Sequence, residues 1–264
     1  MSELKIKMYA LYDHFPERNP EHGQPHIHCY ADSYVTKCTT SGKNIAMLLE
    51  PRSMLGEYYD YVYEHQDYFK YIFTHDSKLL QLPQARFLNW ADVWCTTGSV
   101  KDKGISLVSS WKDWCPLHKA RIELAKFFDD KPWVDCYGSF RGDKDAWTDV
   151  KEAHERYKYA IVIENDIDEY WYTEKLLNCF SNRVVPIYVG ATRIGDIFNT
   201  DGIIQVHNWR IIPEIVRTLD IDNDYLKRFD AINDNFDRVA QYKINWKDRF
   251  FADNETLLER MQNE

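Results

Sequence analysis

The stretch from residue 157 to residue 191, YKYAIVIENDIDEYWYTEKLLNCFSNRVVPIYVGA, constrains the fold more than any other part of the chain. It holds an apolar run at 159–165, a helical pattern at 172–182 and a second apolar run at 184–191. Short apolar runs on either side of a helical segment are typical of buried parallel strands joined by a crossover helix. The stretch therefore predicts one β–α–β unit of a parallel sheet.

The same alternation extends back to about residue 101. Apolar spacing predicts strands over 104–110 and 133–139 and helices over 116–130 and 146–157, with Pro116 suited to a first helical turn. Alternating strands and helices indicate a doubly wound, parallel α/β sheet, whose ligands bind at the carboxyl ends of the strands.

The first hundred residues carry shorter segments. Residues 54–69 are expected to be helical or irregular, and the Pro-, Gly- and Asn-rich residues 16–28 to form a surface loop. Strands are predicted over 5–12, 44–50, 71–75 and 86–91. The last forty residues are typical of two helices broken near 243–245.

This organisation predicts two α/β domains. A chain of 264 residues, 44% of them hydrophobic, is long enough for two such cores. We predict an N-terminal domain over 1–100, a Rossmann-like domain over 101–220, and C-terminal helices over 221–264 that pack on these domains.

Charge and cysteine usage limit the partners and the compartment. The net charge of −9 and the absence of a long Lys/Arg run disfavour nucleic acid, although a few local cations can still bind a small anion. The six cysteines form no CxxC pair, which favours reduced thiols. No signal-peptide pattern or run of ~20 apolar residues is visible, so we expect a soluble, cytoplasmic protein without a membrane span. The oligomeric state is left open.

Polar residues gather where strand 159–165 passes into the next helix. Glu164 and Asn165 end the strand, and Glu174 and Lys175 open the helix. A carboxylate suits paired ribose hydroxyls, and a lysine beside a helix N-terminus suits phosphate oxygens, so the group suggests a nucleotide-sugar site. The alternative is that Thr173 and Glu174 only begin the helix.

The densest cationic segment, SSWKDWCPLHKAR, follows strand 104–110. Ser110 lies at the strand end, and Gly138 ends the next strand along the chain. Arg121 is a candidate to bind a diphosphate and, with Lys175, to neutralise a departing nucleoside diphosphate. The alternative is a solvated helix face.

Glu50 closes strand 44–50 and precedes Pro51. At the carboxyl end of a strand it is either an ordinary solvated carboxylate or a general base for an acceptor hydroxyl.

The histidines near the N-terminus do not favour a metal site. His14, His22, His26 and His28 lack the paired spacing of a zinc site and the additional ligands that would complete one. The chain also has no GxGxxG, P-loop or GxSxG motif.

Four motifs occur in order over about 100 residues: VDCYGS, IEN, YTEK and VPIYVG, followed by IGDIFNTDGIIQV. The set resembles the C-terminal donor domain of family 10 glycosyltransferases, the α1,3/α1,4-fucosyltransferases. Its patterns are Val-Asp-x-Tyr/Phe-Gly, Phe/Ile-Glu-Asn, Tyr-x-Thr-Glu-Lys and Val-Pro-x-x-x-Gly. KNIAMLLEPRS is similar to the family segment whose glutamate is the proposed catalytic base.

The resemblance implies a GT-B architecture of two Rossmann-like domains, and inverting transfer of L-fucose from GDP-β-L-fucose to an oligosaccharide hydroxyl. Because protein cations would neutralise the departing GDP, we expect no required cofactor, with a divalent metal at most stimulating the reaction. Glu50 would be the base, and Arg121 would contact the donor diphosphate.

Further donor contacts are implied on the strand-to-helix segment. Asn165, Glu174 and Lys175 would be donor contacts, with Glu174 toward ribose or sugar and Lys175 toward phosphate. Trp171 or Tyr172 would line the donor pocket, with Trp171 standing where some members have the motif tyrosine.

Two alternatives remain open. The same scaffold could use another nucleotide sugar, because the shared motifs mainly contact diphosphate and ribose. The N-terminal part is short for the family and matches it only around Glu50 and KYIFTHDSKLLQLPQARFL, so acceptor specificity is not inherited and a non-catalytic sugar- or nucleotide-binding module is the other alternative.

Overall fold

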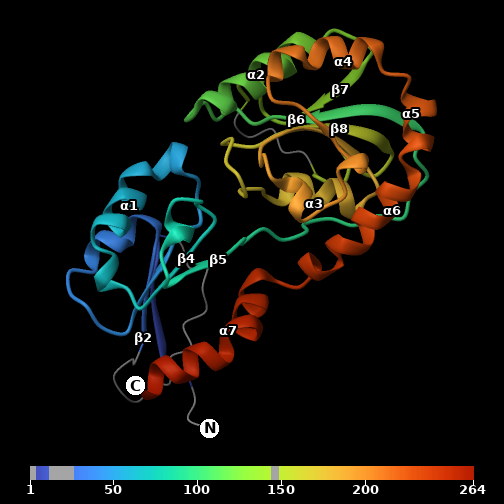
Figure 1. The fold of residues 1–264 in the computed structure, drawn as a ribbon. Coiled ribbons are helices and arrows are strands. Elements are labelled where there is room, and N and C mark those ends of the chain that lie inside the picture. Colours follow the sequence, from blue (N-terminus) through green and yellow to red (C-terminus); the bar gives the residue numbers. More distant parts are fainter. Residues whose placement is uncertain (1–3, 12–26, 144–148) are drawn as a thin grey trace. The chain divides into compact units, whose positions relative to one another are not determined.

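A computed structural model describes residues 4–11, 27–143 and 149–264 (Figure 1). The chain forms two compact units. The first comprises Met1–Trp90 together with Asn245–Glu264, and the second comprises Ala91–Ile244. The sequence placed the boundaries at residues 100 and 220 and grouped all C-terminal helices together. In the structure the terminal helix belongs to the first unit and the helices before it belong to the second.

The first unit is a five-stranded parallel sheet in the order β1-β2-β3-β4-β5. Its strands are β1 (Ile6–Tyr9), β2 (Ile27–Ala31), β3 (Asn44–Met47), β4 (Tyr71–Thr74) and β5 (Ala85–Phe87). Helices α1 (Arg52–Glu64) and α7 (Trp246–Asn263) and the 3-10 turn η1 (Asp32–Lys37) complete it.

Both faces of this sheet are covered. Side chains alternate across a strand, so Ile45 and Met47 of β3 pack with α7, whereas Ala46 packs with α1. Because both faces are buried, β3 carries a continuous buried run and no polar–apolar alternation.

The second unit is a five-stranded parallel sheet in the order β10-β9-β8-β6-β7. Its strands are β6 (Lys103–Val108), β7 (Val134–Tyr137), β8 (Tyr157–Ile163), β9 (Val185–Val189) and β10 (Ile204–Gln205). Its helices are α2 (Pro116–Phe128), α3 (Glu174–Ser181), α4 (Ile212–Thr218), α5 (Ile221–Lys227) and α6 (Phe229–Arg238).

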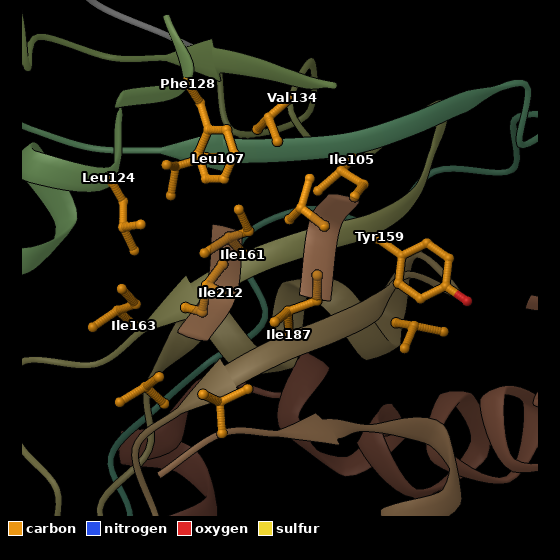
Figure 2. Packing of buried hydrophobic residues seen from close by; sticks show 14 of the residues in the cluster. Ile105, Leu107, Leu124, Phe128, Val134, Tyr159, Ile161, Ile163, Ile187 and Ile212 are labelled. Atoms are coloured by element: carbon orange, nitrogen blue, oxygen red, sulfur yellow. The ribbon is translucent and has the colours of Figure 1, made fainter. Parts of the chain in front are cut away.

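The central strand β8 is buried on both faces. Ile161 and Ile163 pack against α2 and α4, as Figure 2 shows for Leu124, Phe128 and Ile212. The alternate β8 residues Ala160 and Val162 pack against α3. The β–α–β unit predicted from residues 157–191 is confirmed as β8–α3–β9.

Two predictions about local structure were wrong. Residues 149–156, expected to end a helix, form turns, and β8 begins at Tyr157; residues 146–148 of that helix lie outside the described residues. The side chain of Ser106 donates to the carbonyl of Ala153, which holds this turn against β6. At the end of the predicted loop 16–28, Ile27 and His28 instead begin β2; residues 16–26 are outside the described part.

Neither a disulfide nor a membrane-spanning helix occurs among the residues that the structure describes. All six cysteines are free thiols. Among the helices that the structure describes, none combines the length and the apolar character needed to cross a bilayer.

Candidate active site

The donor-side candidates lie at one edge of the second sheet. Ser110 follows β6, Gly138 follows β7 and Asn165 follows β8. Because these strands are parallel, their carboxyl ends meet at the same edge, where α2 and α3 also begin.

Helix α2 carries polar side chains at the start of its buried face. His118, Arg121, Leu124 and Phe128 recur at helical spacing and are all buried. The apolar members reach the core between α2 and the sheet. The two polar members therefore occupy the end of the face nearest the carboxyl edge.

His118, Arg121 and Asn165 form one hydrogen-bonded cluster. Arg121 Nη2 donates to Asn165 Oδ1 at 2.6 Å, and His118 Nε2 lies 2.9 Å from the same oxygen. An amide oxygen only accepts, so His118 carries its proton on Nε2. Burial, reinforced by the charge of Arg121, lowers the pKa of His118 to about 4, which makes it a neutral donor near pH 7.

Arg121 is a buried cation whose charge is incompletely matched. Its Nε has no hydrogen-bond partner within the described residues, and burial lowers its pKa. The carboxylates whose charge reaches it, Glu164 and Glu174, both pair with Lys175. Since a buried guanidinium is costly without an anionic partner, this cluster can bind an anion.

Glu164 anchors the segment between β8 and α3. It is fully buried, and its two carboxylate oxygens accept from the backbone N–H and the hydroxyl of Thr173, at 2.9 and 2.8 Å. Lys175 Nζ lies 3.5 Å from Glu164 Oε2. Both oxygens of Glu164 are thus used within the protein, and burial raises its pKa.

Lys175 and Glu174 open α3 beside this anchor. Thr173 caps the helix by accepting from the Lys175 N–H, and Lys175 Nζ lies 2.9 Å from the Thr173 hydroxyl oxygen and 3.3 Å from Glu174 Oε1. The Lys175 side chain keeps 27% of its surface exposed, so its ammonium group can still meet a ligand. The structure thus confirms a capped helix start, and leaves Lys175 accessible.

Glycines allow close backbone contacts at this edge. Gly138 has φ +96°, and a Cβ there would lie 2.3 Å from the carbonyl oxygen of Ser109, the residue before Ser110. A Cβ on Gly190, which follows β9, would lie 2.6 Å from Glu164 Cγ. Gly190 ends the Val-Pro-x-x-x-Gly motif but was not among the predicted site residues.

Trp171 and Tyr172 lie inside the second unit. Trp171 is 1% exposed and Tyr172 is fully buried, with its hydroxyl 2.7 Å from that of Tyr242. The Tyr172 ring packs edge-on against Phe198. Both rings therefore support the segment from within, and a pocket-lining role for either one stays a prediction.

Glu50 lies in the first unit, three residues beyond the end of β3, and is half-buried. Its N–H donates to Asp32 Oδ1 at 3.3 Å, and its carbonyl accepts from the hydroxyl of Tyr59 at 2.5 Å. The main chain that carries the proposed base is therefore held at both of its polar groups.

Of the four N-terminal histidines, only His28 falls within the described residues. It lies in β2, with Nδ1 3.2 Å from the hydroxyl of Tyr9. His14, His22 and His26 lie outside them. Within residues 4–11, 27–143 and 149–264, no group of three or more His, Cys, Asp or Glu side chains could hold a metal ion.

An open cavity of about 500 Å³ lies beside α2, on a different face from Arg121. It contains none of the predicted donor contacts. Its lining residues are Trp111, Asp113, Lys119, Ile122, Glu123, Lys126, Phe140, Arg141 and Gly142.

Comparison with solved structures supports the fold. A crystal structure of an α1,3-fucosyltransferase with GDP-fucose matches with a TM-score of 0.57 and 14% identity, over 91% of this chain and 80% of its own. A second, with GDP, matches with a TM-score of 0.55 and 16% identity, over 92% and 80%. A third α1,3-fucosyltransferase structure gives 0.54 and 17%, over 89% and 78%. The predicted α/β fold of the GT-B type is confirmed.

Sequence comparison identifies the family. No curated protein matches the chain. The family described as "Glycosyltransferase family 10 (fucosyltransferase) C-term" matches residues 99–260, which span the whole cluster around Arg121 and the Thr173–Lys175 segment. The chain therefore belongs to glycosyltransferase family 10, the fucosyltransferase family.

Proposed function

We propose that this glycosyltransferase transfers L-fucose from GDP-β-L-fucose to a hydroxyl of an oligosaccharide, with inversion at the anomeric carbon. The observation that carries the proposal is the buried cation Arg121, tied to Asn165 at the carboxyl edge and incompletely matched by anions. A donor diphosphate supplies the anion that such a cluster needs. The family, and the fold shared with fucosyltransferase structures solved with GDP-fucose and with GDP, support the choice of donor.

The diphosphate would lie between the starts of α2 and α3. Arg121 and the ammonium group of Lys175 would neutralise its charge, and Ser110 and the backbone at Gly138 would border it. Cys115, the residue before α2, makes no side-chain cap hydrogen bond, so the first N–H groups of the helix after Pro116 would be available to an anion. Because protein groups supply the positive charge, we expect no required metal, and activity that persists in EDTA.

The sugar and ribose would contact the segment after β8. The Asn165 amide and the Glu174 carboxylate are the candidate contacts to ribose or sugar hydroxyls. These groups and Arg121 contact parts common to many nucleotide sugars. Another nucleotide sugar therefore remains the second candidate donor.

Glu50 would act as the general base. It would take the acceptor hydroxyl proton as the acceptor oxygen bonds to the anomeric carbon. The bond from that carbon to the β-phosphate oxygen would break at the same time, and Arg121 and Lys175 would stabilise the departing GDP. One in-line displacement of this kind inverts the configuration, so a β-linked donor gives an α-linked product.

Donor choice is tested by thermal shift and by transfer. GDP and GDP-fucose should raise the melting temperature more than UDP and its sugars. Transfer to N-acetyllactosamine-type acceptors should give an α-linked product by NMR. A larger shift with UDP would move the proposal to a different donor, and the absence of both transfer and donor hydrolysis would favour a non-catalytic module.

The base is tested by Glu50→Gln. General-base loss should lower kcat about 10²–10⁴-fold while GDP affinity stays near that of the unmodified protein. Glu64→Gln, an exposed glutamate of the same unit, is the matched control and should keep full turnover. Full turnover in Glu50→Gln would remove Glu50 from this role.

A further inference from the structure

We propose that Asp32 is a positioning residue, which holds the main chain of Glu50 so that its carboxylate is presented in one geometry. The inference rests on the proposed role of Glu50 as general base.

Asp32 and Glu50 meet because their strands are neighbours. Asp32 directly follows β2, and Glu50 lies just beyond β3. The two strands are parallel and paired with Ala31 opposite Met47. Both chains therefore leave the sheet at the same edge, and residues 18 apart in sequence come into contact.

Side chains hold every backbone polar group of Leu49 and Glu50. Asp32 Oδ1 accepts from the N–H of Leu49 at 2.8 Å and from that of Glu50 at 3.3 Å. The indole of Trp90 donates to the carbonyl of Leu49 at 2.7 Å, and the hydroxyl of Tyr59 donates to the carbonyl of Glu50 at 2.5 Å. This dipeptide has left the sheet, so these four side-chain contacts replace the ladder that would otherwise hold it.

Asp32 adopts a conformation that few residues tolerate. Its φ is +47°, in the left-handed region, where Asp and Asn are favoured over other non-glycine residues. Strained backbone of this kind persists where the surroundings require it and is enriched at functional sites. Burial raises the pKa of the Asp32 carboxyl to about 7, partly offset by its bonds to Leu49 and Glu50. Asp32 thus combines an unfavourable backbone conformation and a buried carboxyl at the position where that carboxyl holds the main chain of Glu50.

Fixing the main chain matters because general-base catalysis depends on geometry. A misplacement of about 1 Å is enough to cost on the order of 10²-fold in rate. Asp32 contacts the main chain of Glu50, so it acts through Glu50 and is not itself assigned to substrate.

Two substitutions separate the carboxyl oxygen from the backbone conformation. Asp32→Gly tolerates the positive φ but removes the side-chain oxygen that accepts the two hydrogen bonds. Asp32→Asn keeps an acceptor oxygen and also tolerates the positive φ. We expect Asp32→Gly to lower kcat about 10–100-fold with the KM for GDP-fucose unchanged. Asp32→Asn should stay within about 3-fold, since an amide oxygen accepts the same two bonds. Circular dichroism and melting temperature establish that each variant is folded.

A double-mutant comparison distinguishes positioning from a general structural role. On the Glu50→Gln background, Asp32→Gly should cause no further loss of kcat, because groups that act as a unit are not additive. An equal loss on both backgrounds would overturn the inference. So would a fully active Asp32→Gly, or a folded Asp32→Asn as slow as Glu50→Gln; the last result is decisive even if Asp32→Gly does not fold.

The failure of this inference differs from the failure of the proposed function. If Glu50→Gln keeps full turnover, or the protein transfers no fucose, the proposed function fails and this inference fails with it. If Glu50→Gln is slow and Asp32→Gly is fully active, only the positioning role of Asp32 is overturned.

Discussion

Arg121 Nη2 donates to Asn165 Oδ1 at 2.6 Å, joining residues that are 44 positions apart in the chain. One lies on the buried face of α2 and the other follows β8. The cationic segment and the acidic segment, which the sequence presented as separate candidates, therefore form one hydrogen-bonded group. Substitution of either residue should affect the other.

Arg121→Met should weaken GDP binding about 10–100-fold, because the substitution removes a cation and the planar donors that a diphosphate accepts. The GDP affinity of Arg121→Lys should lie between those of Arg121→Met and the unmodified protein, since lysine keeps the charge but loses the forked guanidinium donors. Isothermal calorimetry with GDP measures both. Lys126→Met, an exposed position on the same helix, is the control and should bind GDP normally. Unchanged affinity in Arg121→Met would disprove the diphosphate assignment.

Lys175→Met should weaken GDP binding and also destabilise the protein. Its ammonium group lies 3.5 Å from the buried carboxylate of Glu164, and the loss of this cation leaves that charge poorly compensated. The double variant Lys175→Met/Glu164→Gln should recover melting temperature but not GDP affinity. Recovery of both would mean that Lys175 serves only the fold.

Gly138→Ala should destabilise the protein more than Gly142→Ala does. Both glycines have positive φ, +96° and +100°, so alanine costs each about 1–2 kcal/mol. Only at Gly138 would the new Cβ also meet backbone, at 2.3 Å from the Ser109 carbonyl oxygen, which adds about 1–3 kcal/mol. Among the described residues, no atom lies within 4 Å of the Cβ built at Gly142. Equal losses in urea unfolding would contradict the close approach.

The contribution of the buried histidines to stability should fall as the pH drops from about 6.5 to about 4, since unfolded histidine titrates near 6.5. Burial lowers the pKa of both His118 and His154 to about 4 in the folded protein. Over this range the unfolded chain binds protons that the folded chain does not, so the free energy of unfolding decreases.

Urea unfolding at pH 7 and pH 4.5 measures this decrease in stability. His118→Gln should reduce it, and His207→Gln, at an exposed position, should leave it unchanged. An identical pH dependence in His118→Gln and the unmodified protein would count against a buried, neutral His118.

The gain in stability of Asp32→Asn over the unmodified protein should be larger at pH 8 than at pH 4.5. The folded-state pKa of Asp32, about 7, lies above its ordinary value. At pH values between the two, the folded protein therefore binds more protons than the unfolded chain. Its contribution to stability is present in acid and lost as the pH rises through about 7. The difference in unfolding free energy between Asp32→Asn and the unmodified protein should therefore grow with pH, and a constant difference would contradict it.

Local pattern was a good guide where the regular backbone of a strand or helix sets which of its side chains are buried. The strands at β6, β8 and β9 and the helices α2 and α3 were predicted from apolar spacing within a few residues of their ends. The same rule failed at residues 149–157, where Val150, Ala153 and Tyr157 have helical spacing. There Tyr157 lies in β8 and pairs with Lys103 of β6. Pairing with a neighbouring strand overrides a weak helical spacing of side chains.

Apolar runs and motif positions were enough to predict that this chain forms parallel α/β sheets and that its polar motifs follow the strands β6, β7 and β8. Such periodicity and chain order require no knowledge of which strands are neighbours. The folded chain was needed to show that Glu164 accepts hydrogen bonds from Thr173, that Tyr172 is buried, and that Asp32 contacts the main chain of Glu50. These contacts depend on strand order and on packing between segments that are distant in the sequence, and the local spacing of side chains encodes neither.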